Sequence, residues 1–521
     1  MQWPVPQLQN LKVSPHEAVD TLVQKIEVVA KRDPAYYRRR LQLLAGLGYG
    51  YIVVVFVLLF GGLWCLRQLF IAMQNTQGLG NLNTFAGLIA LGFGSLFFVR
   101  FEVPKGVVLT REQVPQLFSM IDELSSALKA PKLDSVILDA RMNAAIAQRP
   151  KFGFIGWHTN YLMIGLPLMQ ALSPDQFKAV LAHELAHLCG DDGRVGAWIY
   201  RVRRTWYELA ERFENTPAGG WLFRGFFSWY GPFFRAYSFV HARAQEYEAD
   251  RRAADLVGAH HKAEALIWLK VNNSQLSEVF YPDFQRQAIA LKSPPDDYMS
   301  TLLKALREEI DSDNIQHWLA LYLAAESTNA STHPCLADRL SALGYAVPDS
   351  LLPPAQRAVT LLGDQLVPLA KQLDQLWEKE QKTSWPTLYQ RSQHKLARLD
   401  RLNAKADHLL TVEEKIKRSI LTWAVAEKRT VLPMFQEILK EAPNHPSVHS
   451  WLGFLLAEKQ NEAGVDHLKF VIENDLALKG SACAWLYSFY LKQAQPELAE
   501  QYRQEWQAHQ KLWRLALQER S

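Results

Sequence analysis

Residues 173–187 read SPDQFKAVLAHELAH, and this stretch decides the class of the domain around it. Ser173 and Gln176 have the spacing of a capping box, in which two side chains satisfy backbone N–H groups of the first helical turn. Pro174 stands at the first helical position, where its missing N–H is no loss. Apolar residues follow at the spacing of a helix with one buried face. The stretch therefore predicts a packed helix that carries the sequence HELAH.

HELAH places two histidines, His183 and His187, four residues apart. Side chains at this spacing project from one face of a helix, so both imidazoles can bind a single Zn²⁺ at about 2.1 Å. Glu184 follows the first histidine, where its carboxylate can act as general base toward a water molecule at the metal. The motif predicts hydrolysis of a peptide bond, with Glu184 as a catalytic residue and one Zn²⁺ per chain as the cofactor.

A third metal ligand has to come from outside this helix. One class of zinc peptidases supplies a histidine about ten residues after the first, but position 193 is glycine, which excludes that class. The sequence AQEYEAD at 244–250 predicts another helix, on which Glu246 and Asp250 share a face. We expect Glu246 to bind the metal and Asp250 to accept the N–H of a ligating imidazole.

Three motifs occur in a fixed order, HELAH at 183–187, QEYEAD at 245–250 and THPCLADRL at 332–340. Together they resemble the HtpX-like family of membrane zinc metallopeptidases, which are relatives of the type I CAAX prenyl protease. The resemblance covers roughly residues 40–345 and implies a gluzincin-type fold. It also implies a role in the quality control of misfolded or membrane proteins.

The same resemblance assigns roles to the third motif. His333 matches a family histidine that stabilises the oxyanion of the tetrahedral intermediate, so we expect it to be catalytic. Arg339 matches a family arginine, which implies pairing with an acidic group near the site. Cys335 stands where the family has a second proline, which is a departure from the family's pattern beside His333.

Short extended segments precede the HELAH helix at 134–139, 143–148 and 161–165. They predict a small antiparallel sheet in a mainly α-helical chain. Peptidases of this family bind the substrate backbone along an edge strand, and we expect Asn143, Ala144 and Ala145 to do so here because small side chains leave main-chain groups accessible. An ordinary strand without a substrate role is an equally open interpretation.

Residues 41–66, LQLLAGLGYGYIVVVFVLLFGGLWCL, carry no charge and are long enough to cross a bilayer. A second uncharged run at 81–99 completes a predicted membrane hairpin, for which a buried soluble hairpin is the alternative. Basic residues gather before the first run and after the second, so we expect both termini and the peptidase domain in the cytoplasm, at a bacterial inner membrane. The inverted orientation stays open.

Residues 219–240 are strongly aromatic, but two arginines interrupt them and the longest uncharged run, 225–234, has ten residues. That run is too short to span a bilayer. We expect the segment to lie at the membrane interface or to cover the active site, with packing against the core as the alternative.

The C-terminal part shows a period of 34 residues, because Trp451-Leu452 recurs as Trp485-Leu486 and Leu468 corresponds to Tyr502. This period is typical of tetratricopeptide repeats, whose stacked helices form a concave surface for peptides and partner proteins. An irregular helical bundle is the alternative. The predicted parts are an amphipathic helix in 1–40, a membrane hairpin at 41–100, a peptidase domain at 101–346, a helical linker region at 347–420 that opens with the Pro-rich joint 347–355, and repeat-like helices at 421–521.

The composition bounds the function. The chain has 521 residues, of which 49% are apolar and 21% charged, which excludes whole-chain disorder and fibrous classes. A formal net charge of +4 argues against a nucleic-acid binder, and four scattered cysteines indicate free thiols in a reducing compartment. We expect protein or peptide substrates, the lipid bilayer and a protein bound by the repeats as partners. The competing hypotheses are a membrane-tethered adaptor with a structural or silent zinc site, and an enzyme that processes one specific partner.

Overall fold

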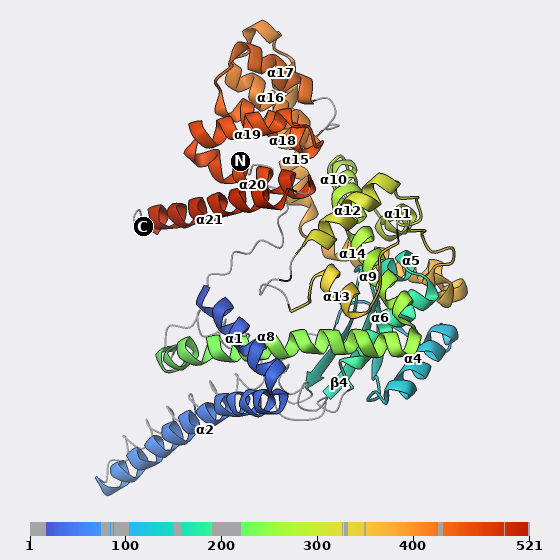
Figure 1. Cartoon of the computed structure of the whole chain (residues 1–521), viewed down its shortest axis with the longest axis vertical. Coiled ribbons are helices and arrows are strands. Elements are labelled where there is room, and N and C mark those ends of the chain that lie inside the picture. The colour runs from blue at the N-terminus through green and yellow to red at the C-terminus, as the bar shows by residue number, and fades with distance from the viewer. Residues whose placement is uncertain are drawn as a thin grey trace.

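The computed structural model describes residues 17–73, 104–150, 158–189, 220–325, 332–348, 351–425, 431–493 and 495–518, with Thr84, Gly87 and Ser327. Figure 1 shows two N-terminal helices, a central domain around a small sheet, and a C-terminal array of helices. The chain is mainly α-helical, as the sequence predicts.

A four-stranded sheet lies in the central domain. Its strands are β1 (Val107–Leu109), β2 (Ser135–Asp139), β3 (Ala144–Pro150) and β4 (His158–Gly165), in the order β1-β2-β4-β3. The predicted segments form β2, β3 and β4, whereas the three residues of β1 are too few to give a sequence signal.

The expectation of an antiparallel sheet is wrong in one pairing, because β2 and β4 are parallel and the sheet is mixed. The chain reverses from β2 to β3 and again from β3 to β4, so β4 runs in the direction of β2. Since β4 and not β3 lies beside β2, a parallel pair results. Gly165 ends β4, where its N–H donates to the Asn143 carbonyl at 2.9 Å; a Cβ there would stand 1.6 Å from the Arg141 carbonyl oxygen.

The HELAH helix is α6 (Pro174–Ala186), and both hydrogen bonds of its predicted capping box are present. It is buried against the sheet and against α4 (Pro115–Leu128), α8 (Gly220–Val257) and α9 (Ala259–Ser274). The same core takes in further short helices: α5 (Leu166–Ala171), a π-helical turn (Gln275–Phe280), α10 (Tyr281–Ile289), α11 (Tyr298–Ala305), α12 (Ser312–Ala324) and α13 (Leu336–Ala342).

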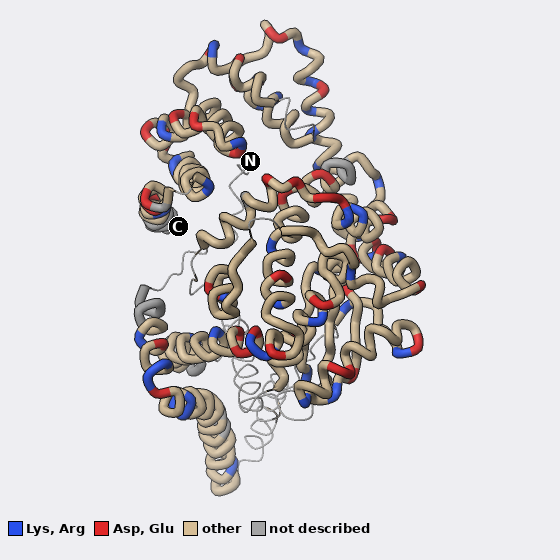
Figure 2. Tube along the Cα trace, turned by 45° about the vertical axis from the view of Figure 1, so that its right-hand side comes forward, with Lys and Arg blue, Asp and Glu red and all other residues tan. Residues whose placement is uncertain are grey.

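The N-terminal helices are α1 (Glu17–Arg32) and α2 (Pro34–Ala72). Helix α2 is long and apolar enough to cross a membrane, with a mean hydropathy of 2.4 over its most apolar window. Figure 2 shows it as a nearly uncharged tube beyond a basic start. The second predicted span at 81–99 falls outside the described residues, apart from Thr84 and Gly87.

Residues 220–240 of the predicted aromatic stretch form the first half of the 38-residue helix α8. Its described side chains, including Tyr230, Phe234 and Tyr237, pack against α1 and α2 in a cluster separate from the central core. The Tyr230 hydroxyl donates to the Leu44 carbonyl at 2.9 Å, and the Tyr37 hydroxyl donates to the Tyr237 carbonyl at 2.5 Å. Through this stretch, the helix that also carries Glu246 packs against the N-terminal helices.

The central core extends past the Pro-rich joint, because a 3₁₀ segment (Ala358–Gln365) and α14 (Leu366–Gln381) add buried residues to it. The remaining helices form the tail: α15 (Trp385–Asn403), a 3₁₀ turn (Asp407–Leu409), α16 (Val412–Val425), α17 (Val431–Glu441), α18 (Pro446–Glu458), α19 (Ala463–Asn474), α20 (Leu476–Lys492) and α21 (Pro496–Gln518).

In the tail, α18 packs against α19 and α20 against α21, and α20 also contacts α12 of the central domain. Gly453 and Gly464 face each other where α18 meets α19, since a Cβ on Gly464 would stand 2.9 Å from the Gly453 carbonyl oxygen. The tetratricopeptide interpretation stays a prediction.

Candidate metal centre

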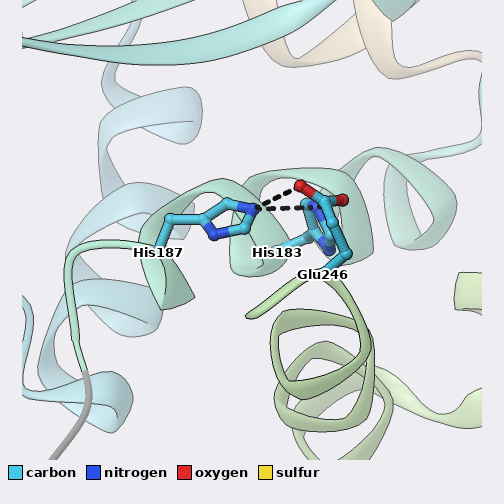
Figure 3. A group of neighbouring side chains, drawn as sticks. All are labelled: His183, His187 and Glu246. Carbon is cyan, nitrogen blue, oxygen red and sulfur yellow. Dashed lines mark hydrogen bonds and ion pairs between the residues drawn. The ribbon is translucent and has the colours of Figure 1, made fainter. Parts of the chain in front are cut away.

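The structure brings together the three predicted metal ligands from two helices. His183 and His187 lie at the end of α6, and Glu246 lies on α8. The His183 and His187 Nε2 atoms are 3.2 Å apart, and the Glu246 carboxylate oxygens lie 3.6 Å from Nε2 of His183 and 3.7 Å from Nε2 of His187. Figure 3 shows the His187 ring directed at the other two side chains.

This geometry fits a zinc ion. Ligand atoms at about 2.1 Å from a tetrahedral metal stand about 3.4 Å from one another. The separations of 3.2, 3.6 and 3.7 Å scatter closely around that value, the last two being measured to different oxygens of Glu246, and the three residues form a group that could hold a metal ion. Two imidazoles and a carboxylate are also a donor set that zinc accepts in peptidases.

The protonation states favour metal binding. Burial, and then the neighbouring His183, lower the pKa of His187 to about 4, so its imidazole is neutral near pH 7. Burial alone would raise the pKa of Glu246, but the adjacent histidines outweigh it, and the net shift is downward. Both groups therefore present free electron pairs without first losing a proton.

Asp250 lies beside Nδ1 of His183, the ring nitrogen that is not the predicted metal ligand. Its Oδ1 atom lies 2.9 Å from Nδ1 of His183, although Nδ1 is not aligned for a hydrogen bond. Arg339 donates two hydrogen bonds of 2.7 Å to the Asp250 carboxylate. The Nζ atom of Lys262 stands 3.1 Å from Oδ1 of Asp250, and the Lys262 side chain is 2% exposed. Burial would raise the pKa of Asp250, but Lys262, Arg339 and His183 together lower it.

Glu184 and His333 complete the predicted catalytic residues. Glu184 is half-buried on α6, and burial raises the pKa of its carboxyl group above the ordinary value. The Nδ1 atom of His333 lies 2.8 Å from Oε2 of Glu246, and its side chain is 63% exposed. His333 is thus next to the predicted ligands and open to solvent, as a group that meets a substrate has to be.

The predicted substrate-binding residues lie on an outer strand. Ala144 and Ala145 belong to β3, Asn143 immediately precedes it, and within the described residues β3 pairs only with β4. Strand β3 also contacts α6. An extended peptide could therefore add to this edge beside the HELAH helix.

Two features of the centre cannot be predicted from the sequence motifs. One is Lys262, one of two lysines in α9. The other is a cavity of about 380 Å³ beside His187, between α8 and the corner of α1 and α2, where Tyr37 and Arg38 form part of the wall. A search for metal-ligand spacing cannot find either, because both depend on how distant helices pack.

The sequence of the central domain also matches a known protein family. Residues 112–347 match the family model described as peptidase family M48, and the match contains α6, Glu246, Asp250 and the THPCLADRL motif. No curated protein matches the chain.

Proposed function

We propose that the chain is a membrane-anchored, zinc-dependent endopeptidase, because residues 112–347 match the model of peptidase family M48, a match that supports a metallopeptidase function. The observation that carries the proposal is the set of separations of 3.2 to 3.7 Å among the donor atoms of His183, His187 and Glu246. Helix α2 supports the anchoring, since it is long and apolar enough to span a bilayer.

The reaction follows from the residues around this centre. A zinc ion held by His183, His187 and Glu246 would supply Lewis-acid polarisation of the scissile carbonyl and acidify water. Glu184 takes a proton from the attacking water and delivers it to the leaving nitrogen. Its raised pKa suits both steps, because a carboxyl group closer to neutrality accepts and returns a proton more readily.

The other site residues position the reactants. Asp250, held by Arg339, orients the His183 ring, and His333 stabilises the charge that develops on the carbonyl oxygen. The edge of β3 from Asn143 to Ala145 binds the substrate backbone in extended form.

The setting of the enzyme is part of the same proposal. We place the peptidase domain and both termini in the cytoplasm at a bacterial inner membrane, because basic residues flank the start of α2 and the cysteines are free. Its substrates are then misfolded or membrane proteins, and the tail helices bind a protein partner.

Casein cleavage by the detergent-purified full chain, with zinc content measured in parallel, tests the enzymatic claim. Glu184→Gln retains zinc and loses about 10²–10⁴-fold in rate, the usual contribution of a general base. Glu123→Gln is the matched control, since Glu123 lies on α4, is 64% exposed and pairs with Lys178 of α6.

Cleavage by Glu184→Gln at the wild-type rate refutes the general-base role. Zinc binding without cleavage by any form, the wild type included, favours the adaptor hypothesis, and binding of partners by the tail then becomes the next measurement.

A further inference from the structure

Lys262 is a buried charged group that the mechanism does not use. It is the fourth residue of α9, its side chain is 2% exposed, and its Nζ atom is 3.1 Å from Oδ1 of Asp250. Removing an ammonium group from water costs several kcal/mol unless close partners compensate for it. The burial of the Lys262 ammonium group therefore has to be explained by an interaction or a role that compensates for this cost.

Charge pairing with Asp250 alone does not supply that explanation. Arg339 already donates to both oxygens of Asp250 at 2.7 Å, and one carboxylate is neutralised by one guanidinium. Lys262 adds a second cation to the same anion. All three neighbours crowd one atom, because Oδ1 of Asp250 also lies 2.9 Å from Nδ1 of His183.

The placement of these charged residues on three different helices explains how the second cation acts. Asp250 is on α8, Arg339 on α13 and Lys262 on α9, so the carboxylate is held from two further elements besides its own. Arg339 holds both carboxylate oxygens from one side, and Lys262 adds a further contact at Oδ1. An ammonium at Oδ1 fixes the oxygen that faces the imidazole, and an imidazole whose Nδ1 proton points at a fixed oxygen presents Nε2 to the metal.

We propose that Lys262 is a positioning residue of the zinc site, which fixes Oδ1 of Asp250 against Nδ1 of His183 and so sets the ligand atom of that histidine. The proposal rests on the proposed zinc enzyme, and it extends the site to α9. Groups that orient metal-binding histidines contribute about 10–100-fold to metal affinity.

The test is the zinc affinity of the detergent-purified full chain, measured by competition with a chromophoric chelator. Lys262→Met keeps the length of the side chain and removes its charge, and its zinc affinity falls about ten-fold. Lys270→Met is the matched control on the same helix, because Lys270 is exposed and lies over the Tyr322 ring at 5.1 Å. Its zinc affinity stays at the wild-type value.

A double-mutant cycle separates positioning from a purely structural role. If Lys262 acts through Asp250, Lys262→Met lowers zinc affinity in the wild-type background and has no further effect in Asp250→Asn. Casein cleavage by Lys262→Met also recovers when free zinc is raised to saturation. A lowered unfolding temperature with unchanged zinc affinity overturns the proposal.

Lys262→Gln serves as the second variant if Lys262→Met does not fold, since it keeps an N–H donor without the charge. Its zinc affinity is again expected to fall, and a wild-type value overturns the proposal. A wild-type chain that binds no zinc refutes the proposed function itself, whereas tight zinc binding by wild type and Lys262→Met alike refutes only the role of Lys262.

Discussion

Substitution of Arg339 by methionine tests how firmly the Asp250 carboxylate is held. The two side chains are 12% and 2% exposed, and Arg339 donates two hydrogen bonds of 2.7 Å to Asp250. Hydrogen bonds to charged groups contribute about 1.5–3 kcal/mol each. Lys262 stays 3.1 Å from the same carboxylate, so Asp250 is not left without a cation and the lower end of the range applies. We expect a loss of about 3 kcal/mol in the free energy of unfolding.

Thermal unfolding of the purified, detergent-solubilised chain measures this loss. A domain of this size loses about 2–4 °C in Tm per kcal/mol, so Arg339→Met lowers the Tm of the central domain by about 6–12 °C. Arg251→Met is the control on α8, because Arg251 is 62% exposed and forms only surface ion pairs with Glu248 and Asp255, which contribute little. Equal Tm values for the two variants would refute the view that the buried carboxylate depends on Arg339.

Two further predictions concern other parts of the chain. Gly165→Ala places a Cβ 1.6 Å from the Arg141 carbonyl oxygen, so we expect more than about 4 kcal/mol of destabilisation and loss of protease-resistant central domain, whereas Gly231→Ala, with open space around it, folds normally. In the tail, burial and then His449 lower the pKa of His467, so the folded state resists a proton that the unfolded chain takes up below its ordinary pKa. The contribution of His467 to the free energy of unfolding is therefore present above that pKa and is lost as the pH falls. Hydrogen exchange of α19, corrected for its intrinsic pH dependence, should accelerate from pH 7 to pH 5.5 in the wild type. The acceleration should be smaller in His467→Gln.

Local signals explain which parts of the fold the sequence predicts. The capping box at Ser173 fixes the start of α6, and the four-residue spacing of His183 and His187 fixes their common face; both depend only on neighbours in the chain. Strands β2, β3 and β4 follow from short apolar segments for the same reason. Glu246 could be found at a distance because its helix carries a second acidic residue on the same face, Asp250.

Non-local packing explains the rest. The parallel pairing of β2 with β4 depends on which strand enters the middle of the sheet, and no residue of β4 specifies that by itself. Lys262 looks like a surface lysine in the sequence, and only the approach of α9 to α8 places it beside Asp250. Arg224 and Arg235 interrupt the apolar pattern, so the sequence does not reveal that the aromatic stretch and the Glu246 segment form one continuous helix.

That continuity limits where the enzyme can cut. Tyr230 binds the backbone of α2 at Leu44, and Glu246 follows it by 16 positions on the same helix, 246 minus 230. At a rise of 1.5 Å per residue the metal ligand lies about 24 Å along α8 from that contact. If α2 spans the bilayer, as proposed, the backbone of Glu246 stands at most about 24 Å from the level of the Tyr230 backbone. An extended chain advances about 3.3 Å per residue, so about seven residues beyond that level reach the backbone of this metal ligand. A membrane protein substrate therefore needs only a short unfolded segment next to its own span to be cleaved.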